Sequence, residues 1–140
     1  MGIHKTLRNL VFVSILIPGP LFGNYEFMSA VQRIAKIYRI EVSQNNMKFT
    51  QGVEEGNNEF QMLVTSNRNN FEMVMLVGFI AAGKAMQELP ALSITKVLVT
   101  VDVPVRGGYK LQAAAGKADL DNFIQGKIVS AEFVRLVKFI

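Results

Sequence analysis

Apolar residues recur along the chain with two periods, one typical of helices and one typical of strands. The first helical pattern covers residues 25–38, where Met28, Val31, Ile34 and Tyr38 fall on one side and basic or amide residues fall mainly on the other. This pattern predicts an amphipathic helix whose apolar side covers a sheet.

Short segments with period two follow this helix and predict three strands. Residues 40–42 and 47–49 each place two apolar side chains on one face, and the Asn-Asn pair between them is typical of a turn. Residues 59–65 alternate apolar and mainly polar side chains over a longer stretch. We therefore expect the sheet to begin as an antiparallel meander.

The longest apolar segment is FEMVMLVGFIAAGKAMQEL at residues 71–89, which follows an Asn-rich segment and precedes Pro90. Residues that favour helix N-caps before it and a proline after it predict one long helix. Apolar residues surround this helix almost completely, so we expect it to be buried on most sides or to contact a partner. It is too short to be assigned as a membrane span.

The clearest strand covers residues 93–105, where valines alternate with other side chains. Gly107 and Gly108 are then expected to close a hairpin onto a second strand at residues 109–115. Close packing against this second strand is indicated by its alanines.

The last part of the chain predicts two helices. Asp119 is expected to cap a short helix that ends at Gly126, and a second helix is expected to begin at Ser130 and continue to the C-terminus with Phe133 in its apolar stripe. The order of elements predicts a small α+β single domain, in which an antiparallel sheet of about five strands has helices packed on one face.

The first 23 residues have the order of a secretory signal peptide: a basic start with Lys5 and Arg8, an apolar run, and a segment rich in proline and glycine. We predict that residues 1–23 are a signal peptide or an uncleaved N-terminal anchor, and that residues 24–140 form the domain. The expected location is exported, periplasmic or extracellular, with only transient membrane contact through this segment. The alternative is a cytosolic fold in which the apolar run forms a buried strand.

Charge argues against one large class of partners. The chain has 15 basic and 11 acidic residues, and no acidic residue lies in the first 23, so the remaining residues carry a small positive excess. Nucleic-acid-binding domains normally carry a clustered basic face, whereas the basic residues of this chain are spread along it. We therefore expect no nucleic-acid partner.

The chain lacks the side chains on which most catalytic mechanisms depend. There is no cysteine, which excludes thiol catalysis, disulfides and cysteine-based zinc sites, and the one histidine is His4 in the signal-like segment. Carboxylate, lysine and hydroxyl chemistry remain. We predict no catalytic residue, no cofactor and no metal site.

The segment GFIAAGKA, residues 78–85, resembles a phosphate-binding loop, and Asp102 ends a strand placed like its usual acidic partner. Such a loop needs Ser or Thr after the lysine to bind magnesium, and Ala85 stands there instead. It must also begin a helix, whereas Pro90 follows closely. We interpret Gly78 and Gly83 as points where another element approaches a buried helix.

Other acidic pairs have structural explanations. Asp119 and Asp121 resemble the start of a calcium loop, but the required glycine and the chelating glutamate are missing, so capping explains both acids. Glu54 and Glu55 are expected in a solvated turn. A Ser-Lys arrangement stays open because spatial proximity cannot be read from the sequence, although no S-x-x-K element supports it.

Two functional hypotheses follow from these patterns. The first is a non-enzymatic exported domain that binds a partner protein, a second copy of itself or an apolar ligand through the surface around the long helix, with Met73, Met75, Phe79 and Met86 as its candidate residues. The second is a hydrolase or nucleotide-using enzyme built on Lys84, Asp102 and carboxylates. The second hypothesis requires those side chains to converge in one cleft.

Overall fold

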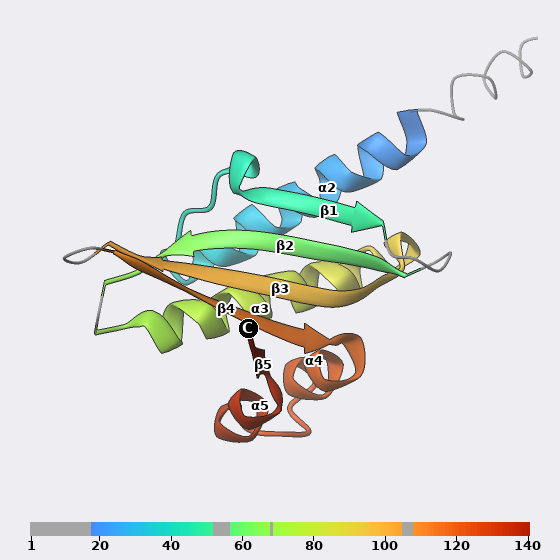
Figure 1. Cartoon of the computed structure of the whole chain (residues 1–140). Helices are drawn as coiled ribbons and strands as arrows, with labels where there is room; N and C mark the ends of the chain where they lie inside the picture. The colour runs from blue at the N-terminus through green and yellow to red at the C-terminus, as the bar shows by residue number, and fades with distance from the viewer. Residues whose placement is uncertain (1–17, 52–56, 68, 105–107) are drawn as a thin grey trace, which may run out of the picture.

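The computed structural model describes residues 18–51, 57–67, 69–104 and 108–140, with side chains from residue 23 onwards. The signal-like run before residue 18, the turn with Glu54 and Glu55, and Gly107 of the expected hairpin turn lie outside the described residues. Within these ranges the chain forms an α+β domain with one five-stranded sheet, which confirms the expected fold class (Figure 1).

Helices and strands are interspersed along the described chain. In chain order they are α2 (Pro18–Ile37), η1 (Gln44–Asn46), β1 (Met47–Gln51), β2 (Asn58–Thr65), α3 (Phe71–Glu88), η2 (Pro90–Leu92), β3 (Ile94–Val103), β4 (Tyr109–Gly116), α4 (Lys117–Ile124), α5 (Ser130–Leu136) and β5 (Lys138–Phe139).

The strands lie in the sheet in chain order, β1 to β5, but the sheet is mixed rather than antiparallel. β2 and β3 run parallel, while the other three neighbouring pairs are antiparallel. The expected all-antiparallel meander was therefore wrong at one pair. The reason is α3, because a helix between two neighbouring strands returns the chain to the same end of the sheet.

Three segments differ from the strand and helix pattern expected. The first is α2, which begins at Pro18 rather than at residue 25. Residues 40–43 form no strand, because Ile40 and Val42 connect α2 to the short η1 turn. The last predicted helix ends at Leu136, and Lys138–Phe139 then pairs with β4 as β5. Asp119 lies in the first turn of α4 rather than at its N-cap, which is Gly116.

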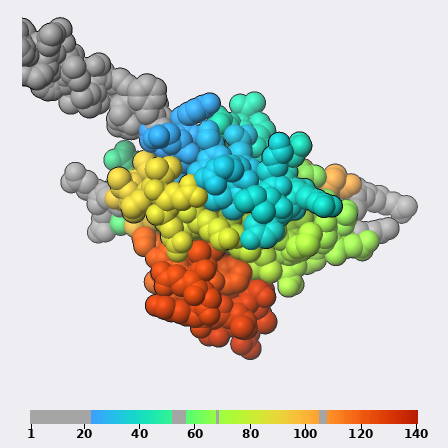
Figure 2. Space-filling view, turned by 180° about the vertical axis from the view of Figure 1, so that it is seen from behind, coloured from blue at the N-terminus to red at the C-terminus, as the bar shows by residue number. Residues whose placement is uncertain are grey.

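The helices form one layer against one face of the sheet. Seen from behind the sheet, α3 lies between α2 and the C-terminal helices (Figure 2). The buried face of the sheet supplies alternate residues such as Phe60 and Met62 of β2 and Val99 and Val101 of β3. Alternation of this kind places the remaining strand residues on the opposite face.

An aromatic cluster joins α2 to the first two strands. The rings of Phe27 and Phe60 lie with their centroids 4.8 Å apart in an edge-to-face arrangement, and Phe49 lies 5.5 Å from Phe27. Phe27 and Phe60 have no exposed surface. The amphipathic pattern of α2 therefore serves to cover β1 and β2, as the sequence indicates.

Candidate functional site

The four candidate residues on α3 have different surroundings. Met75, Phe79 and Met86 are 2%, 0% and 5% exposed and belong to the core, whereas Met73 is 53% exposed. The three buried side chains therefore present no surface to a partner in the folded chain. The apolar composition of α3 reflects its position between the sheet, α2 and α4 (Figure 2).

Apart from acidic residues near its two ends, the exposed residues of α3 form one stripe. Met73, Lys84 and Gln87 are exposed along it, and Leu76 and Ile80 between them are half-buried. The spacing of three or four residues is that of one helical face. This stripe is the part of the predicted binding surface around the helix that is exposed.

The glycines of GFIAAGKA serve close packing. A Cβ on Gly78 would stand 3.0 Å from Val99 Cγ1 of β3, and a Cβ on Gly83 would stand 2.7 Å from Ile124 Cγ1 of α4. These distances confirm that the glycines let neighbouring elements approach the helix. The segment lies inside α3 and not at a helix N-terminus.

Lys84 and Asp102 are not brought together. Lys84 belongs to the exposed stripe of α3, in the helical layer. Asp102 alternates with the buried Val101 and Val103, so its side chain lies on the face of the sheet that the helices do not cover. The sheet therefore separates the two residues on which the enzyme hypothesis was built.

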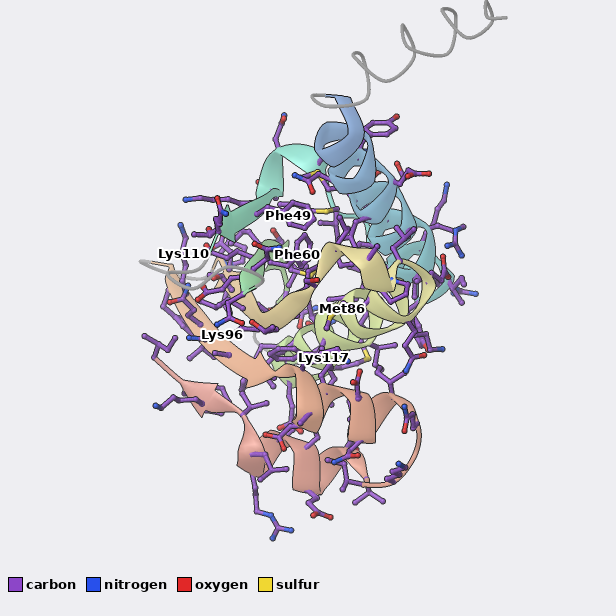
Figure 3. All side chains as sticks on the ribbon, turned by 90° about the vertical axis from the view of Figure 1, so that its right-hand side faces the viewer. Phe49, Phe60, Met86, Lys96, Lys110 and Lys117 are labelled. Carbon is purple, nitrogen blue, oxygen red and sulfur yellow. The ribbon has the colours of Figure 1, made fainter. Side chains whose placement is uncertain are left out.

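The face opposite the helices is the most distinctive surface of the described structure. We call it the open face; β3 contributes Lys96, Leu98, Thr100 and Asp102 to it. No described helix covers it (Figure 1). In a side view, Lys96 and Lys110 lie away from the helices, whereas Phe60 and Met86 lie between the two layers (Figure 3).

Lysines surround this face. Lys48 of β1, Lys96 of β3, Lys110 of β4 and Lys138 of β5 are all exposed. Within the described ranges, the ion pairs closer than 4.0 Å are Arg33–Glu88 and Lys117–Asp121, and neither involves these four lysines. Their charges are therefore available to a partner.

A shallow groove of about 330 Å³ crosses part of the open face. It runs beside η1 and across β2 and β3, and its polar lining is Asn45, Asn46, Lys48, Gln61, Thr100 and Lys110. No carboxylate lines the groove. Among the described residues, the side chains of Gln61, Asn45 and Asn46 make no hydrogen bond.

A larger groove of about 630 Å³ lies beside the C-terminal half of α2, and some of its polar groups are bonded within the fold. The Gln32 amide donates to the Val42 carbonyl at 2.7 Å and accepts from Gln44 at 3.1 Å. Arg33, on its rim, donates to Glu88 at 2.6 Å. Glu41 also lines this groove, whereas the smaller groove has two lysines and no carboxylate, so we take the smaller groove as the candidate site.

The sequence pattern predicted the residues of the open face but did not show that this face is exposed. The strict alternation in β3 implied a second face with Lys96, Thr100 and Asp102, but a sheet face becomes a surface only when no element packs on it. That information required the positions of all the helices.

The part of the chain that the structure describes contains neither a cluster of metal ligands nor a membrane-spanning helix. It contains no group of three or more histidine, cysteine or acidic residues placed to hold a metal ion. None of the helices within it combines the length and the apolar composition needed to cross a membrane.

Comparison with known proteins adds no relative: no family model, no curated protein and no solved structure matches the chain.

Proposed function

We propose that this chain is a non-enzymatic, exported domain that binds a protein partner through the open face of its sheet. The observation that carries the proposal is the separation of the two faces: the helices cover one, and the other presents four exposed lysines without ion pairs in the described structure. Antiparallel and mixed sheets can leave one face to solvent, so an open face alone is ordinary. Polar groups without partners around the groove support a binding role for this face.

The size of the open face sets the kind of interaction. One strand residue occupies about 16 Å² of a sheet face, so the strands offer a surface of roughly 500 Å². A stable interface buries about 800 Å² on each partner. The proposed interaction is therefore a small and reversible contact.

The experiment compares two faces of the molecule. A partner recovered by cross-linking from the native cells is identified, purified and titrated against three forms of the chain. The open-face variant carries Gln61→Arg and Thr100→Arg, which place bulk in the groove. The matched control carries Met73→Arg and Gln87→Arg, on the exposed stripe of α3.

We expect the open-face variant to bind at least about tenfold more weakly, because the added side chains fill the groove, and the control to bind like the wild type. Circular dichroism checks that each variant is folded. Loss of binding in the α3 variant alone would move the site to the helical layer. Full binding by both variants would contradict the proposal.

A further inference from the structure

The lysines on the open face are not evenly offset by acidic residues. In register, Glu59 stands opposite Lys96 and Asp102 opposite Lys110, although neither pair is within 4.0 Å. Lys48 stands opposite Gln61 instead, with no acid across the strand pair.

Lys138 likewise stands opposite an uncharged residue, Ala114. Two lysines, one on β1 and one on β5, are thus without an acidic neighbour across the ladder. The open face carries an excess of positive charge at its two edges.

The middle of the face is less polar than its rim. Leu98 and Ala114, which pair across β3 and β4, are 8% and 5% exposed, and Leu63 of β2 is half-buried. Because Leu98 and Ala114 are buried, a partner would meet mainly the amide groups and the lysines around them. Such a surface suits a chain with spaced carboxylates better than a compact, strongly hydrated anion.

A second copy of the chain is a poor occupant of this surface. In a symmetric dimer through the open face, the same patch lies on both sides of the interface. Lysines such as Lys48 and Lys138 would then add to the same positive field on both sides, which is unfavourable. The available area of roughly 500 Å² is also below that of a stable dimer interface.

Nucleic acid is also disfavoured by the side chains present. Proteins that bind single strands stack bases on aromatic residues, and the described strand residues of the open face include no aromatic side chain.

Building on the proposed function, we propose that the partner contributes an acidic, extended segment that lies in the groove between Lys48 and Lys110. The groove passes from β1 to β4, three strand spacings or about 14 Å, which an extended chain crosses with at least about four residues. Carboxylates of the segment pair with the two lysines. The amides of Asn45, Asn46 and Gln61 donate to its carbonyl groups.

The test uses a fluorescent peptide of ten glutamates and measures its binding by anisotropy. The double variant Lys48→Glu/Lys110→Glu reverses both groove lysines. The matched control Lys84→Glu/Lys127→Glu changes the net charge equally, with one lysine on α3 and one after α4. We expect the groove variant to bind at least about tenfold more weakly and the control to change less than about twofold, with binding that weakens as salt rises from about 50 to 300 mM.

The outcomes separate this inference from the proposed function. Equal weakening in both variants would show attraction to net charge only and would overturn the inference. Failure of the peptide to bind would also overturn the inference. If the identified partner still required Gln61 and Thr100 in that case, the proposed function would stand. Stronger lysine-dependent binding of a thymidine oligonucleotide, or of vesicles containing phosphatidylglycerol, would also overturn the inference and would assign the groove to those anions.

Discussion

At Gly83, the absence of a side chain allows a close helix contact that any larger residue would obstruct. Gly83 lies in α3, where glycine is less favourable than alanine by about 1 kcal/mol. Leu120 and Ile124 of α4 stand so close that a Cβ would meet Leu120 Cγ at 3.1 Å and Ile124 Cγ1 at 2.7 Å. The cost in helix propensity is therefore offset by the packing of α4 on α3.

The variant Gly83→Ala is expected to lower the free energy of unfolding by up to about 2 kcal/mol, because overpacking costs about 1–3 kcal/mol and alanine regains about 1 kcal/mol. Urea unfolding followed by circular dichroism measures the change. Removing the obstructing side chain in Gly83→Ala/Ile124→Ala should make the effect of the alanine smaller than in the wild-type background.

Gly116→Ala is the matched control, since no atom outside its neighbours lies within 4 Å of a Cβ there. Because Gly116 is the N-cap of α4, where glycine is preferred to alanine, this variant should lower stability by no more than about 1 kcal/mol. A Gly83→Ala protein as stable as the wild type would mean that moving Ile124 aside costs no more than the roughly 1 kcal/mol that alanine regains.

At the scale of elements, the predicted cleavage site lies within α2, a helix that packs on the sheet. A cut after Gly23 falls inside α2 and removes its first six residues. Phe27 and Ile34, which are buried in α2, both follow the cut. A cleaved chain therefore keeps these two contacts with the core.

We expect residues 24–140 produced alone to fold, with a Tm within a few degrees of the full chain, because the truncation spares the contacts of Phe27 with Phe49 and Phe60. Residues 29–140 lack Phe27, whose loss costs about 3–5 kcal/mol of the 5–15 kcal/mol that hold a domain together. This shorter chain should be unfolded or strongly destabilised in a thermal melt.

Failure of residues 24–140 to fold would return the earlier residues to the domain and would argue against cleavage after Gly23. Intact mass from fractionated bacterial cells that express the full chain tests the export proposal directly. Loss of residues 1–23 together with recovery outside the cytoplasm is the expected result.

For the whole molecule, the arrangement of layers explains why the apolar α3 does not require a second copy. Ten of its eighteen residues are buried by the sheet and the neighbouring helices of the same chain. The open face, on the other side of the sheet, is polar at its rim and carries a positive excess.

The chain is therefore expected to be a monomer, with a mass by light scattering that stays constant between about 10 μM and 1 mM. A mass that doubles with concentration would contradict this expectation. If Met73→Glu then restored the monomer, the exposed stripe of α3 would be the interface.

Periodicity anticipated much of the fold because it depends on local sequence. The helical pattern of α2, the apolar length of α3 and the alternation in β3 each reflect burial of the element itself. The segment with Ile40 and Val42 misled because two alternating apolar residues also fit a connection that packs on the core. β5, with two residues, is too short to produce a pattern.

The candidate site was much less predictable. An apolar helix signals burial, but the sequence does not say whether its own sheet or a partner provides it. Met75, Phe79 and Met86 turned out to be core residues for this reason. The lysines of the open face are spread from residue 48 to residue 138, so only their cross-strand register reveals them as one group.

The amino-acid sequence alone determined the fold class of this protein and the types of its main elements. Side-chain periodicity and the residues that begin or end helices act over a few neighbouring positions, so they can be read locally. The absence of cysteine is also a property of the sequence. Tertiary structure decided the parallel pairing of β2 with β3, the burial of α3 and the existence of an open face. These features depend on which elements pack together across long separations in the chain, and local patterns carry no record of that choice.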